Sequence, residues 1–102
     1  MEISKPIIFI SGAISNDENY QAKFAEAERK LTEQGYIVIN PTCLNPELPY
    51  EALMRICLSM IDEADELHMI GDDWKYSRGA WREYLYANAK CKKVVGGWNG
   101  RA

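Results

Sequence analysis

Four short apolar or β-branched runs separated by helical segments constrain the fold of this chain most. The first run, residues 6–10, is apolar at every position, as in a parallel strand that is buried on both faces. Further strands are predicted at residues 36–39, 66–70 and 92–95. Helical stripes of apolar residues lie between the strands, and they predict helices at about 17–34, 49–64 and 77–90. Asn16 or Asp17 is the expected cap of the first helix, Pro49 lies in the first turn of the second, and Ser77 caps the third.

Strands that alternate with helices predict an α/β fold, here a flavodoxin- or Rossmann-like parallel sheet of about four strands with helices on both faces. Right-handed crossovers around a central first strand give the strand order 2-1-3-4. At 102 residues the chain is expected to form one domain, residues 1–102. Ligands of such sheets bind beyond the carboxyl ends of the strands, at the point where the strand order reverses.

The composition excludes several classes of partner. The net charge is −3 and there is no block of basic residues, so we expect neither nucleic acid nor a membrane as a partner. Cys43, Cys57 and Cys91 form no CxxC pair, which indicates a reducing, cytoplasmic location. With only one histidine, His68, they do not make a tetrahedral zinc set, so we expect no metal. We interpret His68 as a structural residue of the third strand.

Two segments are predicted to meet at the carboxyl edge of the sheet. The first is the run of small residues 11–15 after the first strand, whose backbone amides a ligand can approach closely. The alternative is an ordinary tight turn between a strand and a helix. The second is the segment 74–89, where Glu83 falls on a helix face of small residues, between Gly79 and Ala87. A carboxylate on such a face is partly desolvated and needs a partner or a function, whereas the alternative is an exposed Glu on an amphipathic helix.

Aromatic residues near the second segment have two interpretations. Trp74, Tyr76 and Trp81 are suited to stacking on a nucleobase, or to packing against a second subunit or the domain surface.

Several segments together resemble a known superfamily. They are residues 8–14, residues 35–41, the Ala-Asp pair before the third strand, and the Ser-x-Gly-Ala-x-x-Glu motif from Ser77 to Glu83. The chain resembles the nucleoside 2-deoxyribosyltransferases and the related 2′-deoxynucleoside 5′-phosphate N-hydrolases over about residues 6–95. It is most similar to a small branch found in phages and bacteria.

This resemblance implies a nucleoside or nucleotide substrate, no cofactor, and a double displacement at the anomeric carbon of the sugar. Glu83 matches the nucleophile, and Ser77 matches a residue that contacts the phosphate in the hydrolase relatives. The implied substrate-binding residues are Phe9, Ser11, Gly12, Ala13, Ser15, Cys57, Ser77 and Gly79. A homodimer or higher homo-oligomer is implied as well, because members of the superfamily associate through helices beside the site.

Two positions depart from the pattern of the active relatives. Phe9 stands where a tyrosine hydroxyl orients the nucleophile, and Cys57 stands where a catalytic aspartate lies. A neutral thiol is a weak acid and a weak hydrogen-bond donor. The first hypothesis is therefore cleavage or exchange of an N-glycosidic bond. The second is a binding protein that holds a nucleotide or nucleotide signal in the same pocket without turnover, and the third is a structural subunit with an empty crevice.

Overall fold

The computed structural model describes residues 5–14 and 17–96. Within them the sheet has four parallel strands in the order β2-β1-β3-β4, which confirms the predicted topology. The strands are β1 (Ile7–Ser11), β2 (Ile37–Ile39), β3 (Glu66–Met69) and β4 (Lys93–Val95). The helices are α1 (Tyr20–Glu33), α2 (Tyr50–Asp62) and α3 (Arg78–Ala89), with two short 3₁₀ helices, η1 (Pro41–Cys43) and η2 (Asp73–Tyr76).

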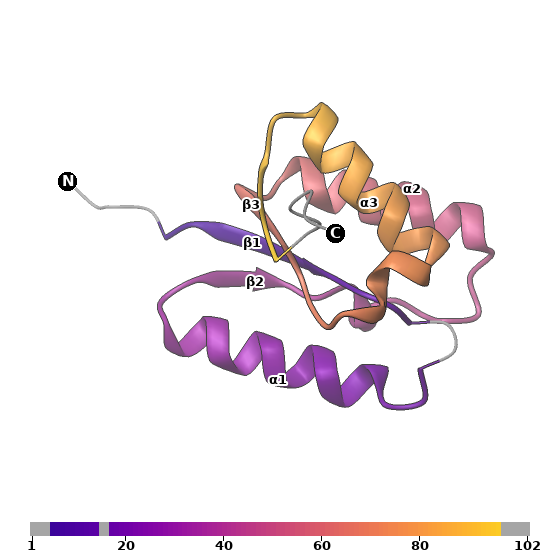
Figure 1. Ribbon diagram of the computed structural model, residues 1–102, viewed down its shortest axis with the longest axis horizontal. Helices are drawn as coiled ribbons and strands as arrows, with labels where there is room; N and C mark the ends of the chain where they lie inside the picture. The colour runs from indigo at the N-terminus through magenta and orange to yellow at the C-terminus, as the bar shows by residue number, and fades with distance from the viewer. Residues whose placement is uncertain (1–4, 15–16, 97–102) are drawn as a thin grey trace.

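The helices form two layers, one on each face of the sheet. Figure 1 shows α1 on one side and α2 with α3 on the other. The side chains of β1 alternate between the two layers, as the period of a strand requires. Ile8 and Ile10 pack with Phe24 of α1, whereas Phe9 packs in the larger cluster with Ile61 of α2 and residues of α3. The face with α2 and α3 therefore contains the larger part of the core.

Helix α1 begins at Tyr20, so its cap residue is Asn19, two residues after the predicted Asp17. Asp17 lies in a turn before the helix, where its carboxylate accepts a hydrogen bond from the backbone N–H of Asn19 at 2.9 Å and pairs with Lys23 at 2.7 Å. Asn16, the other predicted cap, lies outside the described residues. The end of α1 is as expected for a C′ glycine: Gly35 has a φ of +97° and Tyr36 N–H donates to the carbonyl of Leu31.

Helix α2 stops at Asp62, two residues before its predicted end, whereas α3 ends at Ala89 with Lys90 as its C-cap, close to the predicted end. Pro49 directly precedes α2 as its cap residue instead of lying in its first turn. Ser77 caps α3 as predicted, because its hydroxyl accepts from the backbone N–H of Ala80 at 3.3 Å.

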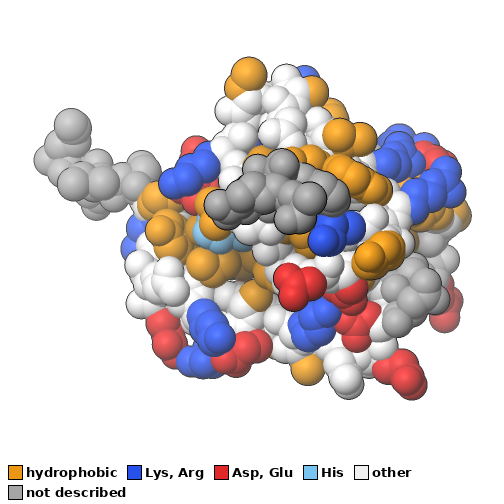
Figure 2. Space-filling view, in the orientation of Figure 1, with side chains coloured by type: hydrophobic (Ala, Val, Ile, Leu, Met, Phe, Trp, Pro, Cys, Tyr) orange, Lys and Arg blue, Asp and Glu red, His pale blue; other side chains and the backbone are white. Residues whose placement is uncertain are grey.

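The surface differs between the layers. Figure 2 shows charged side chains of both signs along the lower edge, where α1 lies, and hydrophobic side chains over α3. The exposed face of α1 contains the ion pairs of Arg29 with Glu26 and Glu33. No helix within the described ranges is long and apolar enough to cross a membrane.

Candidate active site

The central feature of the site is a buried acid, Glu83 of α3, hydrogen-bonded to the end of β1. Only 7% of Glu83 is exposed and Ser11 is fully buried. The Ser11 hydroxyl donates to Glu83 Oε1 at 2.6 Å. The alternative of an exposed Glu on an amphipathic helix is therefore wrong. The small neighbours Ala80 and Ala87, one turn to either side, are buried too, so this face of α3 packs closely on the sheet and encloses the acid.

Burial raises the pKa of Glu83 from 4.5 to about 7, since the carboxylate loses hydration. Hydrogen bonds from Ser11 and from the Cys57 thiol oppose this rise, because they stabilise the ionised form. Burial, together with the adjacent Glu83, raises the pKa of the Cys57 thiol to about 12. At neutral pH, Glu83 therefore exchanges between carboxylic acid and carboxylate, while Cys57 stays a neutral thiol.

A cavity of about 130 Å³ lies beside this acid. Three segments that are distant in the sequence line it: the turn after β1, the region from η1 into α2, and the start of α3. The lining residues are Gly12, Ile14, Pro41, Leu44, Tyr50, Leu53, Met54, Cys57, Ser77, Gly79 and Ala80. Cys57 both lines the cavity and hydrogen-bonds Glu83, so the carboxylate lies one side chain away from the hollow.

Of the two glycines that line the cavity, Gly12 lies in the tighter surroundings. A Cβ atom on Gly12 would lie 2.8 Å from Ile70 Cγ1 and 3.1 Å from the Ile70 carbonyl oxygen, so the turn after β1 packs directly on the end of β3. On Gly79, a Cβ would lie 3.5 Å from Met54 Sδ, in ordinary contact. A larger residue at position 12 would therefore push the turn away from the sheet.

Most of the predicted site residues lie near Glu83, but only some of them line the cavity. Gly12, Cys57, Ser77 and Gly79 line the cavity, whereas Ser11 contacts Glu83 from within the core.

The remaining predicted residues are located elsewhere or are not described. Ala13 is buried in the turn, and Phe9 is fully buried in the hydrophobic cluster of α2 and α3. Ser15 lies outside the described residues.

The aromatic residues next to the site pack on one another. Trp74 is buried in the core, and its ring centroid lies 5.4 Å from that of Trp81 and 5.0 Å from that of Tyr84. Tyr76 is exposed to solvent. None of these side chains is among the described lining of the cavity, so the geometry favours the packing interpretation over a nucleobase sandwich.

Sequence reasoning missed the contribution of η1 and the start of α2 to the cavity. Leu53 and Met54 fall on the apolar stripe of α2, whose period is also that of core residues. Tyr50 begins the helix, and the guanidinium carbon of Arg78 lies 4.6 Å from the centroid of its ring. The preceding prolines, Pro46 and Pro49, were the available signal, because they keep the chain irregular where it enters the helix at the carboxyl edge of the sheet.

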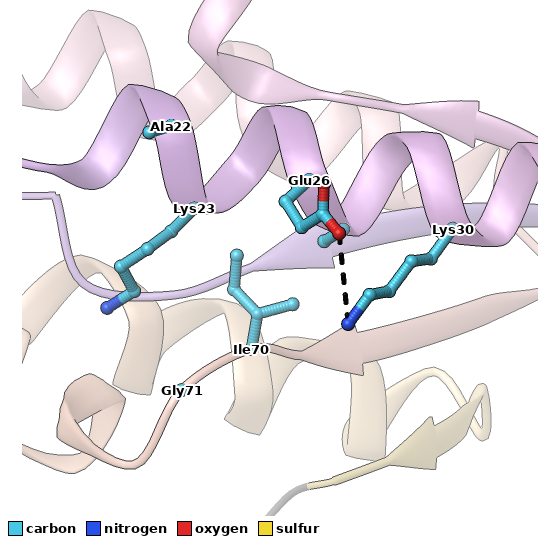
Figure 3. A pocket seen from close by; sticks show the side chains of 7 residues that line it. Ala22, Lys23, Glu26, Lys30, Ile70 and Gly71 are labelled. Carbon is cyan, nitrogen blue, oxygen red and sulfur yellow. Dashed lines mark ion pairs between the residues drawn. The ribbon is translucent and has the colours of Figure 1, made fainter.

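A second hollow, of about 550 Å³, lies on the opposite face of the sheet between α1 and the end of β3 (Figure 3). Lys23 and Lys30 border it, with Ile70 on its apolar side. Lys23 is paired with Asp17 and lies 3.4 Å from Asp73, while Lys30 lies 3.9 Å from Glu26. Its cations are therefore already compensated, and none of the described residues that line it is a buried acid.

Comparisons with known proteins place the chain in a family. Residues 6–96 match the model of a family described as a domain of unknown function, DUF4406. A search of curated proteins finds no match. The matched segment includes the four strands and three helices of the described residues, and both Ser11 and Glu83. Since this match spans most of the sequence, the chain belongs to the DUF4406 family.

Proposed function

We propose that the protein binds a nucleoside or nucleotide in the cavity beside Glu83 and cleaves or exchanges its N-glycosidic bond, with Glu83 as the nucleophile. One observation carries the proposal: a buried carboxylate, hydrogen-bonded to the end of the central strand, is separated from a cavity by one side chain. Burying a carboxylate costs stability, so its presence at the carboxyl edge of the sheet favours a chemical role. The resemblance of the Ser77–Glu83 motif to nucleoside 2-deoxyribosyltransferases supports the choice of substrate.

The proposed reaction has two steps. In the first, an oxygen of ionised Glu83 forms a bond to C1′ of the sugar, and the C1′–N bond breaks with its electron pair going to the base, which takes a proton from solvent. In the second, water or the nitrogen of another base attacks C1′, and Glu83 leaves as a carboxylate. The attacking water or base loses a proton to solvent, so the protons balance. This sequence is the double displacement of a retaining glycosidase.

Residues around the cavity would divide the substrate between them. Gly12 lies at the turn where a sugar or phosphate can approach the backbone, and Ser77 is at the start of α3, where free amides favour an anionic group. Apolar side chains of Leu53 and Met54 suit the face of a base. Because Glu83 has a pKa of about 7, only its ionised fraction would attack, and activity should rise with pH through neutrality.

A second candidate function is binding without turnover. It is favoured by the almost complete burial of Glu83 and by Phe9, whose side chain has no hydroxyl to donate to the acid. In that case the cavity would hold a nucleotide or a nucleotide-derived signal, and Glu83 would contribute to recognition instead of bond cleavage.

The two functions separate in one experiment. The wild-type protein and Glu83→Gln are incubated with a panel of deoxynucleosides, ribonucleosides and their 5′-monophosphates, and free base is measured by chromatography. Glu63→Gln is the matched control, because Glu63 is an exposed acid at the far end of α2. The enzyme hypothesis requires release by the wild type and by the control, and its loss in Glu83→Gln. Release that is equal in all three proteins would refute Glu83 as the nucleophile. If no base is released but one ligand raises the melting temperature by a few kelvin, the binding function is supported.

We also propose that the protein is a cytoplasmic homodimer. The support is an apolar strip on the outer face of α3, where Trp81 is 36% and Leu85 is 59% exposed one turn apart. The cysteines at positions 43, 57 and 91 are free thiols, as expected in a reducing compartment.

A further inference from the structure

We infer that Ser11 is a positioning residue that holds one oxygen of Glu83 in place and does not itself contact the ligand. Its hydroxyl is 2.6 Å from Glu83 Oε1, within the range of short hydrogen bonds to a carboxylate. Ser11 is fully buried, and it is not among the described residues that line the cavity. Its consequence for catalysis rests on the function proposed above, whereas its hold on Glu83 does not.

The backbone fixes the position of this hydroxyl. Ser11 ends β1, the central strand, and pairs with Met69 of β3. Its carbonyl accepts a hydrogen bond from the N–H of Ile70 at 2.7 Å. With the main chain anchored in this way and the side chain enclosed, Oγ has little freedom to move. A hydroxyl has a single proton to donate, and that proton is engaged by Glu83.

Ser11 is the residue of β1 that can perform this task. Side chains on one face of a strand recur at every second position, so Ser11 and Phe9 point to the same layer, toward α2 and α3. Phe9 has no hydrogen-bonding group. Cys57 is the other neighbour that hydrogen-bonds Glu83, and a thiol is a weaker donor than a hydroxyl.

Two consequences follow for the acid. With Oε1 held by Ser11, the plane of the carboxylate is set, although the terminal torsion of Glu is otherwise broad. Oε2 takes no part in this hydrogen bond. Ser11 also stabilises the ionised form of Glu83, so removing the hydroxyl should leave more of the acid protonated at neutral pH.

The test measures the titration of Glu83 directly. The ¹³C shift of its side-chain carboxyl carbon is followed by NMR between pH 4 and pH 10 in the wild type, Ser11→Ala and Ser11→Thr. Ser59→Ala is the matched control, since Ser59 is an exposed serine of α2. We expect Ser11→Ala to raise the midpoint by about one pH unit, a tenfold change in the dissociation constant. Ser11→Thr keeps a hydroxyl, so the titration midpoint of Glu83 in this variant should be that of the wild type. If Ser11→Thr does not fold, the two alanine variants still decide. A midpoint in Ser11→Ala equal to that of the wild type would overturn the inference.

The same variants give a readout in the activity assay. For Ser11→Ala, a midpoint raised by about one unit predicts an approximately fivefold loss of base release at pH 7 that disappears above pH 9. A loss that persists at pH 9 measures the contribution of orientation. Base release equal to the wild type at every pH would overturn the positioning role. If the wild type itself releases no base, the proposed cleavage fails, while the NMR titration still decides whether Ser11 holds Glu83.

Discussion

Replacing Glu83 with Gln should stabilise the protein above pH 7 and leave its stability nearly unchanged near pH 4. Gln has almost the shape of a protonated Glu and can still accept a hydrogen bond from Ser11, but it has no charge to desolvate. In the wild type, the folded state holds the proton of Glu83 up to a pH of about 7, whereas an unfolded chain releases it near 4.5. Between these values unfolding releases a proton, so the stability of the wild type falls as the pH rises.

The magnitude follows from the two pKa values. Below about pH 4 both states are protonated and the acid contributes no difference. Above pH 7 both are ionised, and the folded state has had to bury the charge. The pKa of Glu83 rises from 4.5 in the unfolded chain to about 7 in the folded protein. At about 1.4 kcal/mol per pH unit, this rise corresponds to a loss of about 3 kcal/mol in the free energy of unfolding. For a domain of this size, that is a difference in melting temperature on the order of 10 °C.

Urea unfolding at pH 4.5, 6, 7 and 8.5 provides the measurement, with Glu63→Gln as the control for loss of an exposed carboxylate. The free energy of unfolding of Glu83→Gln minus that of the wild type should grow across the range and level off above pH 7. Many groups titrate in this window, but their contributions cancel in the difference because both proteins share them. A difference that stays constant from pH 4.5 to 8.5 would refute a raised pKa for Glu83, and with it the argument that the fold retains a costly acid for its chemistry.

Three further substitutions test other parts of the structure. Gly96→Ala should lower the free energy of unfolding, measured in urea, by more than about 1 kcal/mol. Gly96 has a φ of +78°, and a Cβ at this position would lie 2.7 Å from the Met69 carbonyl oxygen. An unchanged free energy of unfolding would contradict this turn. Asp65→Ala should lower the free energy of unfolding by about 1 kcal/mol in the same assay, since the Asp65 carboxylate accepts a hydrogen bond from the backbone N–H of Ile7 at 2.8 Å. An unchanged free energy would mean that water replaces this hydrogen bond. Leu85→Asp should convert the proposed dimer to a folded monomer in analytical ultracentrifugation; a dimer that persists would exclude the outer face of α3 as the interface.

The sequence was sufficient to predict the topology. Continuous apolar strands, amphipathic helices and the right-handed crossover rule leave few orders for four parallel strands, and β2-β1-β3-β4 is one of them. The same rules predict the edge of the sheet at which a ligand would bind. They also indicate that the turn at Gly12 and the start of α3 at Ser77 meet there, and both now line one cavity.

Local competition accounts for the errors at the helix ends. Asp17 is a good cap by residue type, but its carboxylate bonds to Asn19 and Lys23, which closes a turn before α1 begins. Periodicity did not identify the cavity wall at the start of α2, although Cys57 of the same helix was predicted to bind the substrate and lines the cavity. Leu53 and Met54 follow the same period as core residues, and sequence periodicity identifies a buried face without saying whether a neighbouring side chain or a hollow lies against it.

The burial of Glu83 changes how the two departures in the sequence should be weighed. Phe9 removes a hydroxyl from the face of β1 that points to α3, yet Ser11 places another hydroxyl 2.6 Å from the acid two residues later on the same face. The acid therefore keeps a strong donor, which offsets part of the loss at position 9. Cys57 is different, because its thiol, with a pKa of about 12, cannot deliver a proton to a departing base at neutral pH. In the proposed reaction the base takes that proton from solvent, which favours substrates whose base is already a good leaving group. The choice of base is then the most informative variable in the substrate panel.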